Sequence, residues 1–241
     1  MKLLTFLKNR NRESNQSASS SSSDAKNFLN QVAIIPKMNK AARVLFALDA
    51  TASREATWDV ASQLQDEMFS AAHDLGGLDI KFCYFRGFGE FFASEWHRDG
   101  SALRAQMRKI RCAAGATQIH RVFNHAIDEN RKQKLKALVF VGDAMEENLD
   151  TLAELAGKLG LLNVPIFMFQ EGADPLVQTA FKNLARLSGG AYSAFDLGSA
   201  NEIRILLGAV AVYAAGGVKA LTRHCAGASG SLKLLEQQLG K

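Results

Sequence analysis

The sequence contains no continuous apolar stretch long enough to cross a bilayer. Its longest apolar runs, such as residues 161–169, include polar residues or proline and fall well short of the roughly 20 residues that a membrane-spanning helix needs. The amino terminus, MKLLTFLKNRNR, has an apolar core of only five residues and no small-residue cleavage site, so it is a poor secretory signal. We therefore expect a cytoplasmic protein with no membrane span.

Cysteine is scarce, and two common catalytic motifs are absent. The three cysteines, Cys83, Cys112 and Cys225, show no C-x-x-C pairing, which argues against a disulfide framework or a zinc site. Neither a Gly-x-x-x-x-Gly-Lys-Ser/Thr loop nor a Gly-x-Ser-x-Gly elbow occurs. We interpret the cysteines as reduced thiols and do not expect nucleotide hydrolysis.

The net charge of +5 is concentrated at the amino terminus. Residues 1–43 hold 8 Lys/Arg and 2 Asp/Glu, which leaves 21 basic and 22 acidic residues for the remainder. The remainder is therefore nearly neutral, and no specific nucleic-acid partner is expected. Residues 9–27 are Ser-rich and carry no apolar side chain larger than Ala, so residues 1–40 are predicted to form a disordered basic tail and linker.

Beyond residue 40, apolar runs typical of buried strands alternate with segments of helical periodicity. The predicted strands cover 43–48, 78–86, 90–96, 135–141, 164–169 and 191–195, and the predicted helices cover 58–75, 100–110, 119–127, 149–161, 175–187 and 199–215. This alternation predicts an α/β fold, with a doubly wound, mostly parallel six-stranded sheet and helices on both faces. The strand order expected for such a sheet is 3-2-1-4-5-6.

Two boundaries follow from short glycine-containing segments. Only Gly87-Phe88-Gly89 separates the second strand from the third, so the third strand is expected to be an antiparallel edge strand. From Gly216 onward, Gly and Ser breaks surround one late amphipathic piece. We therefore predict a domain over residues 41–216, followed by a C-terminal tail or short helix over residues 217–241.

The first strand ends in an acid that two hydroxyl side chains follow. Its apolar run stops at Asp49, and Thr51 and Ser53 come next at alternate positions, which point the same way in an extended loop. A second aspartate, Asp143, follows the fourth strand, and Thr117 lies in the loop before the preceding helix. Because strands 1 and 4 are neighbours in the expected order, these five oxygen-bearing side chains are expected to converge there. An all-oxygen cluster suits Mg²⁺ or Mn²⁺.

These residues resemble the von Willebrand factor A domains with a metal-ion-dependent adhesion site. The motif of that family is Asp-x-Ser-x-Ser, then a Thr, then an Asp after the fourth strand. Here it appears as Asp49-Ala50-Thr51-Ala52-Ser53, Thr117 and Asp143. Thr51 replaces the more usual first Ser and retains its hydroxyl. The resemblance covers about residues 43–215.

The resemblance implies a non-enzymatic binding module of the bacterial intracellular type. In this family the five residues hold the metal, partly through water, and leave one coordination position open for an Asp or Glu of a protein partner. Intracellular relatives often serve as adaptors for larger, frequently ATP-driven, assemblies. No catalytic residue is expected.

Two other interpretations remain open. A phosphotransferase of the haloacid dehalogenase type would use Asp49 as its nucleophile, but phosphatases of that family need a second Asp where this chain has Thr51. Alternatively, Asp49, Thr51 and Ser53 cap the following helix and no metal binds. Thr117 is itself suited to a plain helix cap, whereas capping leaves Asp143 unexplained.

The neighbouring polar and aromatic residues have simpler explanations. Glu146 and Glu147 follow the second acid and either add negative charge to the crevice or begin a solvated helix. His120 is expected on a helix surface. Phe91 and Phe92, beside the Gly87–Gly89 turn, are more consistent with core packing than with a partner surface.

Overall fold

The computed structural model describes residues 41–54, 77–196 and 200–239. All of them belong to one compact unit, residues 40–241. The predicted tail over residues 1–40 and the predicted helix over residues 58–75 lie outside the described residues.

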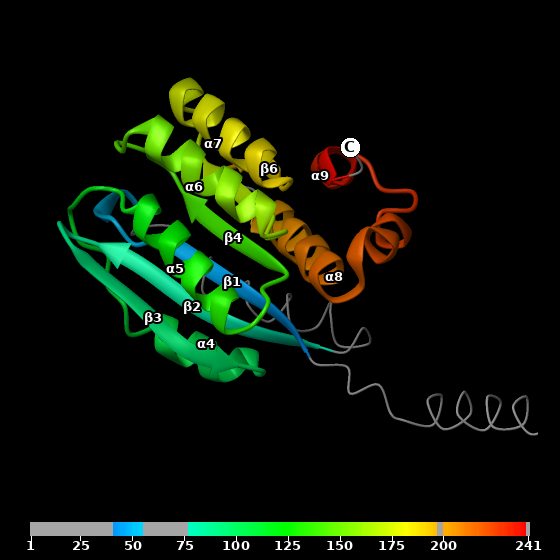
Figure 1. The fold of residues 1–241 in the computed structure, drawn as a ribbon, viewed down its shortest axis with the longest axis horizontal. Helices are drawn as coiled ribbons and strands as arrows, with labels where there is room; N and C mark the ends of the chain where they lie inside the picture. Colours follow the sequence, from blue (N-terminus) through cyan, green and yellow to red (C-terminus); the bar gives the residue numbers. More distant parts are fainter. Residues whose placement is uncertain (1–40, 55–76, 197–199, 240–241) are drawn as a thin grey trace, which may run out of the picture. The chain divides into compact units, whose positions relative to one another are not determined.

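Six strands form one sheet in the order β3-β2-β1-β4-β5-β6 (Figure 1). Their bounds are Ala42–Asp49 for β1, Leu78–Arg86 for β2, Glu90–His97 for β3, Ala137–Gly142 for β4, Ile166–Glu171 for β5 and Ala191–Phe195 for β6. Neighbouring strands are parallel except β2 and β3, which pair antiparallel. The predicted fold class, strand order and antiparallel edge strand are therefore confirmed.

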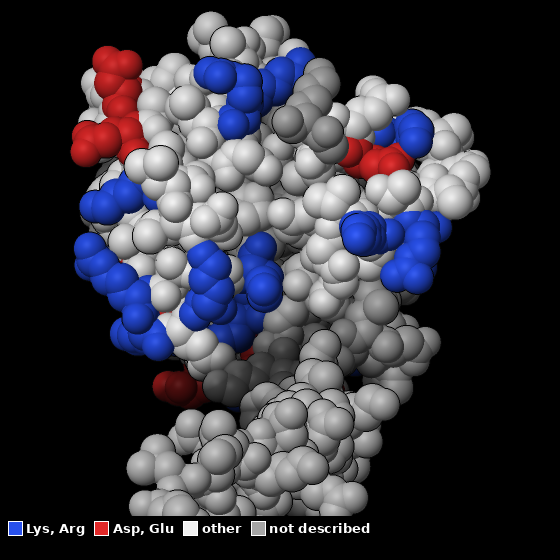
Figure 2. Space-filling view, turned by 45° about the vertical axis from the view of Figure 1, so that its right-hand side comes forward, with Lys and Arg blue, Asp and Glu red and all other residues white. Residues whose placement is uncertain are grey.

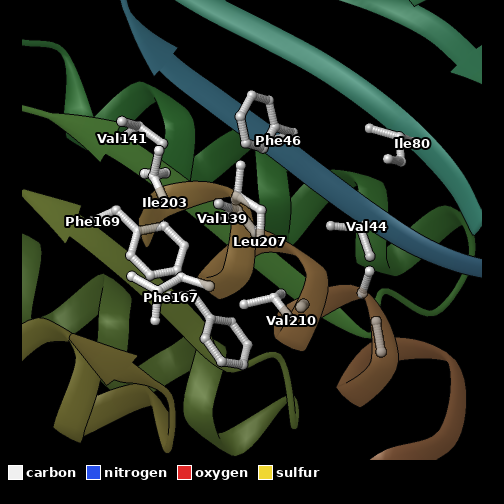
Figure 3. Packing of buried hydrophobic residues seen from close by; sticks show 14 of the residues in the cluster. Val44, Phe46, Ile80, Val139, Val141, Phe167, Phe169, Ile203, Leu207 and Val210 are labelled. Atoms are coloured by element: carbon white, nitrogen blue, oxygen red, sulfur yellow. The ribbon is translucent and has the colours of Figure 1, made fainter. Parts of the chain in front are cut away.

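The sheet is covered on both faces, which explains why its central strands are continuously apolar. Alternate residues of β1 belong to two separate buried clusters, with Val44 and Phe46 on one face and Leu45 and Ala47 on the other. Figure 3 shows the first cluster, where Ile203, Leu207 and Val210 of a helix pack against side chains of the sheet. Only strands buried on both faces tolerate this pattern.

The described helices are α4 (Gly100–Met107), α5 (Ile119–Lys132), α6 (Leu149–Leu161), α7 (Pro175–Ser188), α8 (Ala200–His224) and α9 (Ser231–Leu239), together with the short 3-10 helix η1 (Ala52–Arg54). Buried residues of α5, α6 and α7 belong to one cluster, and those of α4, α8 and α9 belong to the other. In Figure 1, α5, α6 and α7 lie side by side along one face of the sheet. Asn148 and Asp174 cap the amino termini of α6 and α7 with their side chains.

The carboxyl-terminal part differs from the sequence prediction. The predicted helix over residues 199–215 continues as α8 to His224, with a kink at Gly217, whose φ of 70° and ψ of −171° are not helical. Glycine therefore interrupts the helix axis as expected, but a second helical segment begins at once. The short helix predicted within residues 217–241 is α9, and its Leu235 is fully buried in the same cluster as the sheet.

By length and composition, Ile203–His224 is the one described helix that could cross a membrane. This is weak evidence, because core helices meet the same criterion and 56% of the segment is buried inside the protein. Its apolar side chains at Ile203, Leu207 and Val210 face the sheet (Figure 3). Packing on the sheet therefore accounts for its composition.

Charge is unevenly distributed over the surface. Figure 2 shows one face, on which several groups of Lys and Arg side chains are separated by few Asp and Glu. The nearly neutral count for the chain beyond residue 43 therefore conceals a basic face. Acidic side chains lie at the carboxyl edge of the sheet, where Glu146 is exposed and Asp143 and Glu147 are partly exposed.

A buried carboxylate near the carboxyl end of α5 joins this helix to three strands. Glu129 lies 2.7 Å from Lys132 Nζ, 3.3 Å from Lys81 Nζ and 3.5 Å from Arg43 Nη2, and Trp96 Nε1 donates to it at 3.2 Å. The Arg43 guanidinium also lies 3.5 Å from the centre of the Trp96 ring. Burial alone would raise the pKa of Glu129, but Lys132 and Lys81 lower it to about 2.

Replacing Glu129 by Gln is expected to lower the free energy of unfolding by about 3 kcal/mol at pH 7, because Arg43 and Lys81 lose their buried counter-charge. The folded-state pKa lies below the usual value of 4.5, so this stabilisation is present above pH 4.5 and is lost as the pH falls towards about 2. Urea denaturation at several pH values measures it. The difference between the two proteins should shrink across this window, and a constant difference would contradict the assignment.

The matched control is Asp128→Asn on the same helix. Asp128 pairs with Arg131 at 2.8 Å, but both side chains are more than half exposed. This variant should change the free energy of unfolding by less than about 1 kcal/mol.

Candidate metal site at the carboxyl edge of the sheet

The end of β1 places an acid and two hydroxyls together. Asp49 is the last residue of β1, and its side chain is fully buried, on the sheet face that α5 covers. The Thr51 N–H donates to Asp49 Oδ1 at 2.7 Å, and Thr51 Oγ1 lies 3.2 Å from Ser53 Oγ. Thr51 is buried and Ser53 is exposed. The predicted convergence of these hydroxyls is therefore present, and it opens to the surface at Ser53.

The neighbouring strand brings Asp143 to the same edge. Leu48 of β1 pairs with Val141 of β4, so Gly142 lies beside Asp49. A Cβ at Gly142 would lie 2.9 Å from the Phe140 ring, so glycine here leaves room for that ring, and the same Cβ would lie at contact distance, 3.4 Å, from Asp49 Cβ. Asp143 follows immediately. Its Oδ1 is buried and has no hydrogen-bond partner among the residues that the structure describes.

Thr117 is fixed by a residue of the β4–α6 loop. Its N–H donates to Glu146 Oε2 at 2.9 Å, and the Glu146 N–H donates to Thr117 Oγ1 at 3.1 Å. This reciprocal pair joins the loop before α5 to the loop that carries Asp143. Thr117 Oγ1 retains a second lone pair and its own proton. It can therefore contact a further group while holding Glu146 in place.

Backbone contacts attach the Thr117 loop to the ends of β1 and β2. The Ala113 N–H donates to the Ala50 carbonyl at 3.1 Å, and the Ala116 N–H donates to the Gly87 carbonyl at 3.3 Å. A Cβ at Gly115 would lie only 2.0 Å from the Gly87 carbonyl oxygen, so glycine is required for this approach. Three loops thus meet at one edge of the sheet.

Glu147 caps the amino terminus of α5, a role that the sequence does not predict. The Ile119 N–H donates to Glu147 Oε2, the His120 N–H donates to Glu147 Oε1 at 3.0 Å, and His120 Nδ1 lies 2.5 Å from the same oxygen. The N-cap residue Gln118 makes no side-chain capping bond. A carboxylate favours a helix amino terminus because it meets unpaired N–H groups and the positive end of the helix dipole.

These contacts change two expectations for the neighbouring residues and agree with a third. Glu146 and Glu147 do not begin a solvated helix, since both bind the segment that leads into α5. Thr117 is not the N-cap residue of α5, because Gln118 occupies that position. His120 is exposed on the helix surface, as expected, and pairs with Glu147. The sequence signal for the Glu146 and Glu147 contacts is the presence of two consecutive acids after Asp143. This pattern does not identify the residues that they bind.

The aromatic residues near the β2–β3 turn divide into two groups. Phe91 packs against the core, with its ring centre 5.5 Å from His125, and Phe92 stacks on Tyr84 at 5.4 Å. Phe92 is nevertheless 40% exposed, and Phe88 at the tip of the turn is 92% exposed. Core packing therefore describes Phe91 and only part of Phe92, whereas Phe88 faces solvent.

The turn that carries Phe88 is attached to the same loop as Thr117. Arg121 Nη1 donates to the Gly89 carbonyl at 2.6 Å, and Gln118 Nε2 donates to the Arg86 carbonyl at 3.3 Å. Together with the Ala116 bond to Gly87, these contacts hold the turn from three sides. Phe88 is thus an exposed aromatic side chain on an anchored turn at the edge where Asp49 lies.

In the described ranges, no three His, Cys, Asp or Glu residues form a group that could hold a metal ion. The predicted site contains only two such residues, Asp49 and Asp143, and its other members are hydroxyls. Asp49, Thr51 and Ser53 lie together, and Gly142-Asp143 lies beside them. Thr117 joins them through Glu146. Metal ligation by these five residues stays a prediction.

No family model and no curated protein sequence matches the chain. Solved structures match its fold. An aerotolerance-related membrane protein from Bacteroides fragilis is 15% identical, with a TM-score of 0.58 over 71% of this chain and 98% of that one. The VWA domain of SpRpn10 is 13% identical, with a TM-score of 0.54 over 65% of this chain and 89% of its own. The pilus adhesin SpaC from Lactobacillus rhamnosus GG is 9% identical, with a TM-score of 0.55 over 73% of this chain and 30% of its own.

These likenesses, together with the strand order and the antiparallel β3, establish the fold. The chain has a von Willebrand factor A fold. At these identities the comparison extends to the fold alone.

Replacing Glu147 by Gln is expected to lower the free energy of unfolding by about 1–2 kcal/mol, because the two α5 N–H groups bond to different carboxylate oxygens and an amide has only one oxygen that can accept. Urea denaturation measures this change. Glu154→Gln is the control, since Glu154 is exposed on α6 and should change stability by no more than about 0.5 kcal/mol. Equal effects of the two substitutions would show that Glu147 does not act as a cap.

Proposed function

We propose that the chain is a metal-dependent protein-binding module, in which Asp49, Thr51, Ser53, Thr117 and Asp143 hold Mg²⁺ or Mn²⁺. The observation that carries the proposal is the meeting of these residues at one sheet edge, where the buried Asp143 Oδ1 has no hydrogen-bond partner in the described part of the chain. A buried carboxylate oxygen without a partner is costly, and a cation would compensate it. Hydroxyls and carboxylates are ligands that Mg²⁺ accepts.

The five residues of the proposed site differ in solvent exposure, which indicates the side from which a partner could reach the metal. Asp49, Thr51 and Thr117 are buried, whereas Asp143 is half-buried and Ser53 is exposed. The protein side of the metal would therefore be formed by the deep residues, and access from solvent would be beside Ser53 and Asp143. A bound divalent cation supplies a positive centre that prefers oxygen ligands and keeps several waters. A carboxylate from a partner protein can replace one of those waters.

Phe88 supplies a second contact for such a partner. Its side chain is exposed on a turn that bonds to the Thr117 loop, so it lies at the rim of the proposed site. An anchored aromatic side chain contributes contact area with little loss of conformational entropy. The surface thus fits a partner that presents an Asp or Glu beside an apolar side chain.

The solved structures of this fold are consistent with a binding role. One of them is a pilus adhesin and another is a minor pilin. For this chain we propose a role as an adaptor in the cytoplasm, where the partner is a subunit of a larger assembly.

No observation favours the phosphotransferase alternative over this one. A nucleophilic Asp49 would have to meet a phosphoryl group, but Asp49 is fully buried and its Oδ1 accepts the Thr51 N–H. Thr51 cannot supply the general acid that such phosphatases need. We therefore propose a non-enzymatic module.

The chain is expected to bind one Mn²⁺ or Mg²⁺ saturably, and Asp49→Ala and Asp143→Ala are each expected to weaken binding by about tenfold or more. Thr51→Ser should retain binding, since it keeps the hydroxyl. Isothermal titration calorimetry measures the affinities, with circular dichroism to show that each variant is folded. Asp128→Ala is the control, because Asp128 is an exposed acid on α5 away from this edge. Equal binding by all variants would place the metal elsewhere.

Carboxylate recognition can be tested without knowing the partner. With Mn²⁺ bound, N-acetyl-aspartate amide should displace a metal-bound water and reduce the paramagnetic relaxation of water protons, whereas N-acetyl-asparagine amide should not. Phe88→Ala should leave the signal of the Mn²⁺-loaded protein unchanged, because Phe88 is proposed to touch the partner and not the metal. If the two peptides act equally, the open position does not select a carboxylate.

A further inference from the structure

Among the residues that the structure describes, β6 is the last strand of the sheet and pairs only with β5. The Gly172 N–H donates to the Phe195 carbonyl on the β5 side at 3.0 Å. In a parallel ladder, alternate residues direct their N–H and C=O groups to opposite sides. Phe195 faces β5, and Tyr192 and Ala194 therefore direct their backbone groups to the outer edge.

A side chain of α9 occupies this edge. The Tyr192 N–H donates to Gln238 Oε1 at 2.9 Å, and Gln238 Nε2 donates to the Tyr192 carbonyl at 3.0 Å. The primary amide of Gln238 thus forms the same pair of hydrogen bonds that a residue of an added strand would form. In Figure 1, α9 lies beside β6 and away from the edge where β1 ends.

The sequence of β6 contains no residue that would prevent another strand from pairing with its outer edge. AYSAF contains no charged residue and no proline. Edge strands that lack such residues pair readily with other strands, and proteins commonly cover them with a helix. The Gln238 bonds and the packing of Leu235 provide this cover here.

The attachment of α9 allows it to leave without disturbing the sheet. It follows the last strand in the chain, and a connection with Gly227 and Gly230 at positive φ joins it to α8. Leu235 is its only fully buried residue, Leu234 is 59% exposed, and Gln238 lies at the surface. Leu232 and Leu239 pack against the same cluster while only partly buried, so Leu235 and the two Gln238 bonds are the contacts that release of α9 would break completely.

We propose that the outer edge of β6 is a strand-pairing surface, that α9 covers it, and that β6 of a second copy of this chain pairs with it when α9 is released. A second copy fits because β6 is uncharged, so an antiparallel pair around a two-fold axis brings no like charges together. Release of α9 also exposes the apolar site of Leu235 on each copy. Burial of these sites against each other favours association.

The test compares the full chain with a chain that ends at Gly230, by size-exclusion chromatography with light scattering over a range of protein concentrations. The full chain should be monomeric and the shortened chain dimeric.

In the full chain, Gln238→Ala should raise the dimer fraction and accelerate hydrogen exchange of the Tyr192 amide in the remaining monomer. Gln237→Ala is the matched control, since this neighbouring glutamine is exposed. A monomeric shortened chain at every concentration would overturn the proposal.

A further substitution distinguishes strand pairing from simple apolar association. Ala194→Pro in the shortened chain removes an outward N–H while leaving the ladder to β5 intact, so it should restore the monomer. A dimer that persists would show association through the Leu235 site and not through the strand edge. If the shortened chain does not unfold in one cooperative thermal transition, the double variant Leu235→Asp with Gln238→Ala takes its place, with the same expected dimer and the same overturning result.

Discussion

The arrangement of this protein's candidate site depends on close approach between backbone segments at the carboxyl edge of the sheet. Gly115 allows its loop to lie against the Gly87 carbonyl, where an added Cβ would lie only 2.0 Å from the carbonyl oxygen. Any side chain at this position would push the two loops apart. Gly142, at the end of β4, leaves room for the Phe140 ring beside Asp49. The hydroxyls and carboxylates can meet at this edge only because the backbone around them is so closely packed.

The helix α5 is held at both ends by buried or partly buried carboxylates. Glu147 binds its amino-terminal N–H groups, and Glu129 near its carboxyl end binds Arg43 and Lys81 of β1 and β2. The second contact lies at the beginning of β1 and the candidate site lies at its end. The position of Thr117 relative to Asp49 is therefore fixed by charges at both ends of the same strand and helix.

The hydrophobic periodicity of the sequence and its turn residues predicted the fold well, because periodicity indicates which residues are buried and turn residues indicate where the chain reverses. The bounds of β2, β6 and α6 agree with the sequence prediction, since each is a periodic segment bounded by clear turns. The Glu129 cluster and the Glu147 cap were not predicted, because most of their partners lie far away in the chain: Trp96 is 33 positions from Glu129, and Ile119 and His120 are 28 and 27 positions from Glu147. Charged residues on a helix look solvated in sequence, and only the tertiary fold shows which of them are buried. The candidate site residues could be grouped before the structure was known because the expected strand order placed β1 beside β4 and the resemblance named the same five positions, and their metal ligation stays a prediction.

The two proposed surfaces are compatible because they lie on different parts of the sheet. The candidate metal site is between the ends of β1 and β4, whereas α9 covers the outer edge of β6, with β5 in between. Pairing of two copies through β6 would leave both metal sites accessible. A dimer would then present two carboxylate-binding positions, and a partner with two acidic segments would bind it with higher avidity than a monomer. Release of one helix at the sheet edge would in this way change the strength of binding at a distant site without altering any residue of that site.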